Sequence, residues 1–271
     1  MELNWCLNTL YIKPHDIKSK IETCSKFGFK GVELWVEEIE DDPKLVKKIL
    51  NDNGVYACSV EKIVGWFEND GELMGVPSNH LKIMDECKRR MELASMIGSN
   101  KIIACPSFSH RGFHAPLNQG VDYFKELVDI GKSYEIEPVI EFMGQTGQIN
   151  NISSVLKFLS FIDNSRTIVD AYHVWRGGDS MSNLFKLKLN QIGMLHISDA
   201  SGSIPRLEHK DRDRLLPGDG CIDLKGFLKN ISIIGYNGNI SLGVYNPKFW
   251  ELSIFEAVKL ARDKCNELFA F

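Results

Sequence analysis

The sequence lacks several features that would assign the protein to a particular class. No apolar run approaches the roughly 18 residues of a membrane-spanning helix, so no membrane partner is expected. The formal net charge of −4 lacks the basic excess of a nucleic-acid-binding surface, so no nucleic-acid partner is expected either. The seven cysteines contain no C-x-x-C pair, and they are interpreted as small buried hydrophobic residues in a reducing compartment. Residues 1–5 do not resemble a secretory signal, so a cytoplasmic protein is expected.

The chain also lacks a Gly/Ser/Pro-rich linker or a break in composition, so one domain over residues 1–271 is expected. Apolar residues make up 44% of the chain, which is ample for a buried core. Short apolar runs alternate with longer amphipathic stretches. Strands are predicted at residues 3–8, 31–36, 55–60, 101–105, 139–144, 167–170, 194–199 and 239–244. Helices are predicted at residues 16–27, 43–52, 79–97, 117–134, 151–162, 181–189, 223–234 and 249–269.

Strands that alternate with helices of this length imply parallel pairing through right-handed crossovers. Eight such units in a chain of 271 residues favour an α/β fold closed into a (β/α)8 TIM barrel. The longest irregular segments are predicted at residues 65–78, 106–116 and 199–220. All three follow strands, which is the end of a barrel where enzymes build their sites.

Three predicted strands deliver a potential metal ligand at or near their C-terminal ends. These ligands are Glu141, Asp170 and His196, on the fifth, sixth and seventh strands. Two carboxylates and one imidazole suit a single divalent ion such as Mn²⁺, Zn²⁺, Mg²⁺ or Co²⁺. The alternative is that each residue only caps a strand end or pairs with a neighbouring arginine. A fourth run of the same form, residues 240–245, carries Gly243 where a ligand would be expected.

Other polar residues lie close to these strands in the sequence. His173 follows Asp170 by three residues, and it either faces the same cavity or lies on a surface loop. Arg214 lies in the long segment after the His196 strand, where its guanidinium could orient an oxygen-rich ligand. The alternative for both Arg212 and Arg214 is a solvated charge cluster, an interpretation that suits Arg212 better than Arg214.

Three further features have weaker interpretations. Glu33 lies at the exit of the second strand. It could support a metal ligand or form a salt bridge at the barrel rim, and the salt bridge is the favoured interpretation. Trp66 and Trp175 follow strands and either wall a polyol pocket or cover the rim. Gly-Asp-Gly at 218–220 follows no predicted strand, so it does not favour a phosphate loop.

At these residues the chain resembles the xylose isomerase-like TIM barrel (sugar isomerase/epimerase) family, and within it the inosose isomerases of inositol catabolism. The resemblance covers nearly the whole length. It is most specific in the segments IEFMG at 140–144, VDAYH at 169–173, LHISD at 195–199, DRLLPGDGCID at 213–223 and SLGVYNP at 241–247.

The resemblance implies one divalent metal held by Glu141, Asp170, His196 and a second glutamate, whose position here is Gly243. It implies that Glu141 also transfers protons and that His173 and Arg214 contact the sugar. The expected reaction is isomerisation or epimerisation of a keto-inositol or ketose, a small polyol or sugar, through an enediolate. Whether the chain forms a homo-oligomer is left open.

Three alternatives to an isomerase stay open at this point. A dehydratase (lyase) could use the same enolate to expel a β-hydroxyl group from a keto-polyol. A barrel that binds sugar without turning it over is compatible with the loss of the glutamate at Gly243. A barrel nuclease is disfavoured, because it needs a larger metal cluster and a basic surface.

Overall fold

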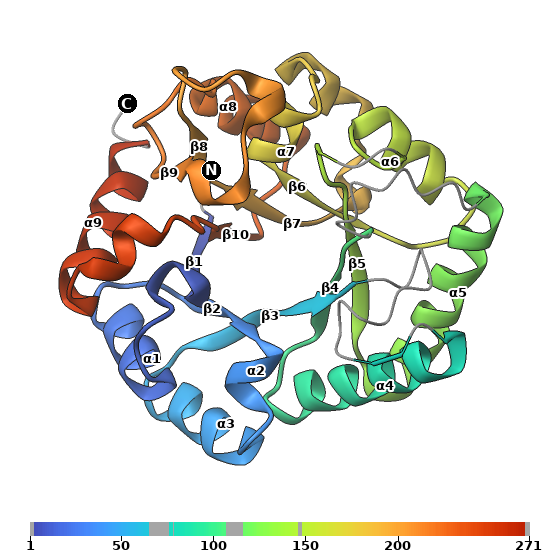
Figure 1. Cartoon of the computed structure of the whole chain (residues 1–271), viewed down its shortest axis with the longest axis horizontal. Helices are drawn as coiled ribbons and strands as arrows, with labels where there is room; N and C mark the ends of the chain where they lie inside the picture. The colour runs from blue at the N-terminus through green and yellow to red at the C-terminus, as the bar shows by residue number, and fades with distance from the viewer. Residues whose placement is uncertain (1–2, 65–75, 78, 107–115, 146–147, 269–271) are drawn as a thin grey trace.

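The computed structural model describes residues 3–64, 76–77, 79–106, 116–145 and 148–268. Eight parallel strands close into a barrel in the order β1-β10-β7-β6-β5-β4-β3-β2, which confirms the predicted TIM barrel. The barrel strands are β1 (Asn4–Asn8), β2 (Gly31–Trp35), β3 (Tyr56–Ile63), β4 (Lys101–Ala104), β5 (Glu137–Glu141), β6 (Thr167–Asp170), β7 (Ile192–Ile197) and β10 (Asn239–Leu242). Figure 1 looks down the barrel, with the helices arranged in a ring around these strands.

The helices begin and end at the signals that the sequence provides. They are α1 (Ile17–Lys26), α2 (Val36–Ile39), α3 (Pro43–Asp52), α4 (His80–Met96), α5 (Leu117–Tyr134), α6 (Ile152–Leu159), α7 (Ala171–Arg176), α8 (Leu224–Ile234) and α9 (Ile254–Glu267). Asp16 caps α1 by accepting a hydrogen bond from the Ser19 amide at 2.9 Å. Gly28 follows the end of α1 at φ +76°, a conformation that favours glycine.

Several predicted elements differ from the observed ones. The predicted helix at 181–189 consists of two 3-10 turns, η3 (Met181–Lys186) and η4 (Leu189–Gln191), and the short helix α7 was not predicted. The last helix begins at Ile254 instead of residue 249, because Ser253 and Glu256 form a capping box there. The 3-10 turn η7 (Pro247–Glu251) precedes it.

The segment 199–220 is less irregular than predicted. The two short strands β8 (Asp199–Ala200) and β9 (Arg214–Leu215) pair antiparallel within it, and the 3-10 turns η5 (Arg206–Glu208) and η6 (Asp211–Asp213) lie between them. A further 3-10 turn, η1 (Thr9–Ile12), follows β1. The β8–β9 pairing fixes the backbone of Arg214 beside the end of the barrel.

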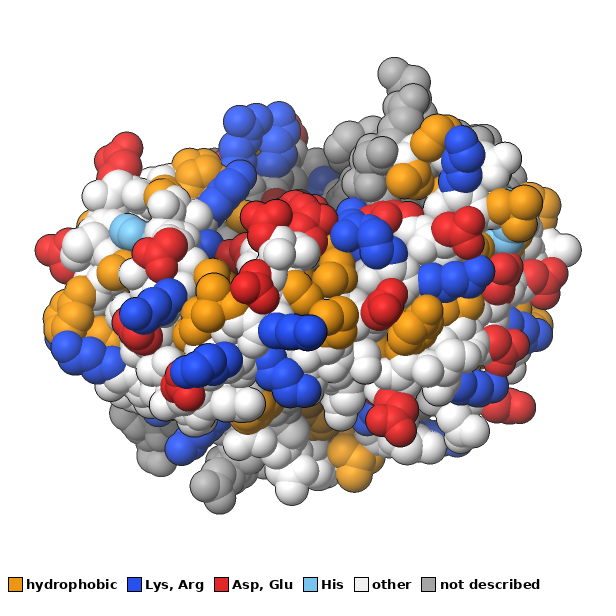
Figure 2. Space-filling model, turned by 90° about the horizontal axis from the view of Figure 1, so that it is seen from below, with side chains coloured by type: hydrophobic (Ala, Val, Ile, Leu, Met, Phe, Trp, Pro, Cys, Tyr) orange, Lys and Arg blue, Asp and Glu red, His pale blue; other side chains and the backbone are white. Residues whose placement is uncertain are grey.

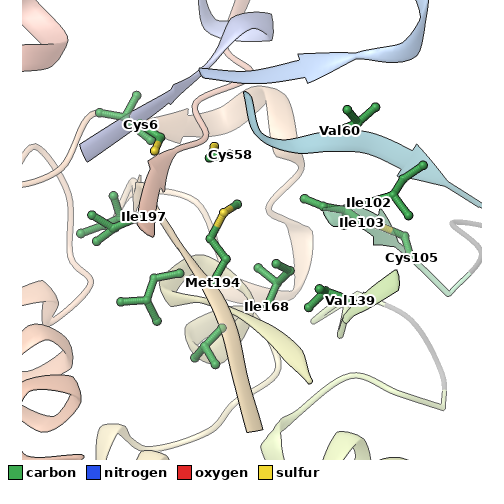
Figure 3. Packing of buried hydrophobic residues seen from close by; sticks show 14 of the residues in the cluster. Cys6, Cys58, Val60, Ile102, Ile103, Cys105, Val139, Ile168, Met194 and Ile197 are labelled. Atoms are coloured by element: carbon green, nitrogen blue, oxygen red, sulfur yellow. The ribbon is translucent and has the colours of Figure 1, made fainter. Parts of the chain in front are cut away.

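The barrel interior is filled with apolar side chains. Figure 3 shows residues of several barrel strands around one space, among them Cys6, Cys58, Ile102, Val139, Ile168 and Met194, each at most 2% exposed. Of the seven cysteines, six are buried and Cys221 is exposed, and all are free. The interior is therefore a packed core, and any ligand has to bind at an end of the barrel.

On the face in Figure 2, acidic and basic side chains are interspersed. Among the described residues, no helix is long and apolar enough to cross a membrane.

Candidate active site

A cavity of about 200 Å³ lies at the C-terminal ends of the barrel strands. Its described lining residues come from strand ends and from the segments that follow them: Leu10, Trp35, Glu61, Lys62, Glu141, Met143, His173, Asp211, Arg214 and Tyr245. This is the end of the barrel at which the sequence predicted a site. The sequence did not single out Trp35, Glu61 or Tyr245, because none of them belongs to a recognisable ligand pattern.

The three predicted metal ligands lie on consecutive strands. Glu141 is the last residue of β5, Asp170 is the last of β6, and His196 is the last but one of β7. Asp170 and His196 are paired in the register of β6 and β7. All three side chains are almost fully buried, so their polar groups need partners within the protein or from a ligand.

His196 lies between two carboxylates. Its Nδ1 is 2.8 Å from Oε1 of Glu141, and its Nε2 is 3.0 Å from Oε2 of Glu33. Burial disfavours a charged ring, but the two carboxylates outweigh this effect and raise the pKa of His196 well above its ordinary value. Burial likewise disfavours the ionised form of Glu141, but the His196 ring holds the pKa of that carboxyl below its usual range.

Glu33 does form an ion pair, but with the buried His196 instead of a residue at the rim. Its side chain is fully buried, accepts a hydrogen bond from Ser59 Oγ at 2.6 Å, and contacts His196. A carboxylate that binds the far nitrogen of a metal-ligating histidine fixes the tautomer and the orientation of that ring. Glu33 is placed to support His196 in this way.

Asp170 is held by an arginine from the segment after β7. Nη1 of Arg214 donates to Oδ2 of Asp170 at 2.7 Å, and the amide of Tyr172 donates to Oδ1 at 2.8 Å. Burial opposes ionisation of Asp170, but the Arg214 guanidinium lowers the pKa of Asp170 below its usual range. Arg214 is 2% exposed and lies 4.0 Å from the centre of the Tyr172 ring. Arg212 is exposed.

His173 lies in α7, so it is not on a surface loop. The amide of Gly144 donates to its Nδ1 at 3.2 Å, and Nη2 of Arg214 lies 3.1 Å from its Nε2. Burial lowers the pKa of His173, which keeps the ring neutral. A neutral imidazole accepts at one nitrogen only, so two donors facing its two nitrogens leave one contact unsatisfied. An oxygen atom of a ligand between His173 and Arg214 would accept from both.

The side chains of Glu141, Asp170 and His173 fit a divalent ion in type and in spacing. Among the described residues, ligand atoms of Glu141, Asp170 and His173 lie within 4.8 Å of one another. Two ligand atoms on one ion are separated by up to about 4.6 Å, because each lies roughly 2.0–2.3 Å from it. His196 does not join this group, although its Nδ1 touches Glu141. The 2.8 Å between these two atoms is close to the roughly 3 Å that separates adjacent ligands of one ion.

The remaining predicted residues lie outside the cavity or outside the described part of the chain. Trp175 is half-buried in α7, packs against His209 at 5.2 Å between ring centres, and is not among the described lining residues. Trp66 lies outside the described residues. The Gly-Asp-Gly segment encloses a protein carboxylate, since the amides of Gly218 and Gly220 each donate to Asp199 at 3.0 Å.

Gly243 immediately follows β10, and its amide donates to the carbonyl of Ile197 at 3.1 Å. A Cβ atom at this position would lie 3.3 Å from the hydroxyl oxygen of Tyr245. The space that a side chain at 243 would enter is therefore partly filled by a phenol.

Together these features define a (β/α)8 barrel with a buried cluster of carboxylates and imidazoles at the C-terminal ends of its strands. The sequence pattern of the xylose isomerase-like TIM barrel family matches residues 21–265, and the chain belongs to this family.

Individual relatives carry more specific names. The chain is 26% identical to an inosose isomerase of Halalkalibacterium halodurans over 259 residues, covering 92% of this chain and 89% of that protein. It is 21% identical to a 3-dehydroshikimate dehydratase of Pseudomonas aeruginosa over 239 residues, covering 86% of this chain and 37% of that protein. The solved structure of the IOLI protein with a zinc atom superposes with a TM-score of 0.88, at 22% identity and over 98% of both chains.

Proposed function

We propose that the protein is a divalent-metal-dependent isomerase or epimerase that acts on a keto-inositol or ketose through an enediolate. The observation that carries this proposal is the buried cluster of Glu141, Asp170 and His196 on adjacent strands, with His173 and Arg214 beside it. The similarity to an inosose isomerase supports the substrate class. The cavity of about 200 Å³ is smaller than the roughly 300–1,000 Å³ of pockets for drug-sized ligands, which fits a small polyol.

In this proposal Glu141, Asp170 and His196 would hold the ion. When bound, the ion would supply Lewis acidity that favours negative charge on a substrate oxygen. His196 would be the third ligand, because Glu33 binds its Nε2 and leaves its Nδ1 for the ion. His173 is less suited, because its Nδ1 already accepts from Gly144 and its Nε2 faces Arg214. Binding by all three ligands requires Asp170 and His196 to approach each other.

The side chains around the ion have distinct roles. Glu141 is held as a carboxylate and lines the cavity, so it is the base that removes a proton from the carbon beside the substrate carbonyl. Nε2 of His173 and Nη2 of Arg214 face each other, and a substrate oxygen beside them would accept a hydrogen bond from both. The Asp170 carboxylate fixes the Arg214 guanidinium for this contact.

The test is proton exchange on a panel of keto-inositols and ketohexoses in D2O, each with Mn²⁺, Zn²⁺, Mg²⁺ or Co²⁺. We expect deuterium at the carbon beside the carbonyl and a product of otherwise unchanged composition, detected by NMR and mass spectrometry. Glu141→Gln should slow exchange by about 10²–10⁴-fold. Asp129→Asn, an exposed carboxylate, is the matched control and should not slow it. Absence of exchange for every compound and metal would refute the proposal.

A dehydratase is the second candidate, because the chain also resembles a 3-dehydroshikimate dehydratase. The same enolate can expel a β-hydroxyl group. The mass of the product separates the two reactions, since dehydration removes one water and isomerisation removes none.

A further inference from the structure

The cavity wall beside Gly243 is formed by the phenol of Tyr245. A Cβ at 243 would meet the Tyr245 oxygen at 3.3 Å and its Cζ at 3.6 Å. The Tyr245 ring is held edge-on against Trp35, with 6.3 Å between the ring centres. The segment after β10 therefore places the Tyr245 hydroxyl in the part of the cavity that a side chain at position 243 would enter.

The Tyr245 hydroxyl is bonded to a second glutamate of the cavity. It donates to Oε1 of Glu61 at 3.4 Å. Of the two hydrogens on Nδ2 of Asn8, one is donated to the same Oε1 at 3.2 Å and the other to Oε1 of Glu33. The orientation of the Asn8 amide is fixed, because its Oδ1 accepts from the Leu10 amide and from Trp35 Nε1, each at 3.0 Å. Asn8 and Tyr245 therefore hold Glu61 in one position.

Glu61 offers its other oxygen to the cavity. Among the described residues, both hydrogen bonds to its carboxyl group end on Oε1, which leaves Oε2 for a ligand. Glu61 is 2% exposed and lines the same cavity as Glu141. The two glutamates come from β3 and β5, with β4 between them, so they reach a common ligand from different directions.

The surroundings of Glu61 favour a carboxyl group that holds its proton. Burial, together with the charges of Glu33 and Glu141, raises the pKa of Glu61 to about 8 against the opposing effect of Lys62. A buried carboxyl group that keeps its proton at neutral pH can act as a general acid.

We propose that Glu61, held by Tyr245, is the second catalytic proton-transfer group of this cavity and works together with Glu141. The inference rests on the isomerase function proposed above. In the first step the Glu141 carboxylate removes the proton from the carbon that bears the hydroxyl, and the electron pair of that C–H bond forms the C=C bond of an enediol. The carbonyl oxygen takes up the π electron pair of the C=O bond as the enediolate forms, and the Glu61 carboxylic acid then gives its proton to this oxygen.

The second step returns both groups to their starting states. The Glu61 carboxylate removes the proton from the other enediol oxygen, whose O–H electron pair forms the new C=O bond. The C=C electron pair takes the proton from Glu141 at the former carbonyl carbon. Glu141 thus moves a proton between carbons and Glu61 moves one between oxygens. Tyr245 is a positioning residue, since its hydroxyl donates to Glu61 and stabilises the carboxylate between the steps.

The experiment compares the wild-type protein with Glu61→Gln, Tyr245→Phe and the exposed control Glu92→Gln. The readouts are kcat, KM and the pH profile of metal-loaded protein on whichever keto-polyol exchanges deuterium with the wild type. For Glu61→Gln we expect kcat to fall by about 10²–10⁴-fold with KM little changed, and the decline in rate above about pH 8 to disappear. Tyr245→Phe should move this decline to higher pH, because the carboxylate loses a donor. Glu92→Gln should match the wild type.

The outcomes separate the two proposals. If the wild-type protein exchanges deuterium and Glu61→Gln has the same rate and pH profile, the role of Glu61 is overturned. The isomerase function then still stands. A wild-type protein without exchange on any compound overturns the proposed function, and the role of Glu61 with it. Should Glu61→Gln not fold, the pH profile of Tyr245→Phe decides, and an unchanged profile overturns the inference.

Discussion

The contact between Gly243 and Tyr245 makes a prediction about stability that is independent of any substrate. Gly243→Ala adds one Cβ atom, 3.3 Å from the Tyr245 hydroxyl oxygen and 3.6 Å from Cζ. Gly243 is not among the glycines with positive φ, so its backbone accepts alanine without strain. The tight contact with the phenol is therefore the main cost of the substitution.

The size of the effect follows from the hydrogen bond of Tyr245. Its hydroxyl donates to Glu61 over 3.4 Å, so a displacement of a few tenths of an ångström breaks this bond. A hydrogen bond contributes about 0.5–1.5 kcal/mol, so Gly243→Ala should destabilise the protein by about 0.5–1.5 kcal/mol. In a Tyr245→Phe background the phenol oxygen is absent, so Gly243→Ala should be neutral or should stabilise the protein by about 0.4–1 kcal/mol. The stabilisation arises because alanine lowers the conformational entropy of the unfolded chain.

The assay is urea denaturation of the four proteins of this double-mutant cycle, with EDTA present to remove metal. The free energies of unfolding should show an interaction of about 0.5–1.5 kcal/mol between the two positions. Equal effects of Gly243→Ala in both backgrounds would refute the placement of the phenol against Gly243, and with it the geometry on which the role of Tyr245 depends.

Three further predictions concern buried carboxylates. The raised pKa of Glu61 means that the folded state holds a proton more tightly than the unfolded chain, so stability should fall by up to a few kcal/mol as pH rises from about 5 to about 8. Glu61→Gln in EDTA should flatten this decline in the free energy of unfolding, and an equal slope in both proteins would contradict it. Asp170→Asn removes one of the two carboxylates that pair with the buried Arg214, which keeps Asp211, and should cost about 1.5–3 kcal/mol in urea denaturation. The exposed Asp129→Asn should cost about 0–1 kcal/mol, and similar losses would argue against a buried pair. Asp199→Ala removes the acceptor of the Gly218, Gly220 and Ile222 amides and should lower the melting temperature, whereas Asp199→Asn, which keeps one oxygen, should lower it less.

The barrel could be predicted from the sequence because each strand is a short apolar run between helices with clear boundary signals. Pro43 opens α3, and Asp223 caps α8 through the Gly226 amide. Glu141, Asp170 and His196 could be placed at strand ends because each stands at the end of such a run. Local pattern alone was sufficient for these features.

The rest of the site depends on contacts between distant parts of the chain. The bond between Glu33 and His196 joins residues 163 positions apart, and that between Tyr245 and Glu61 joins residues 184 apart. Glu61 lies on β3 two residues before its last residue, in a strand that was predicted to stop at residue 60. No local signal marks Glu61 or Tyr245 as cavity residues, since their positions follow only from closure of the barrel.

The measurement that tests the central claim most directly is equilibrium binding of Zn²⁺ and Mn²⁺ to metal-free wild-type protein, His196→Ala, His173→Ala and Glu33→Gln. We expect one ion per wild-type chain and little binding to His196→Ala. Affinity should be about 10–100-fold lower in Glu33→Gln, which loses the carboxylate that orients His196, and nearly unchanged in His173→Ala. A wild-type protein that binds no ion, or binding that is lost in His173→Ala and kept in His196→Ala, would contradict the account.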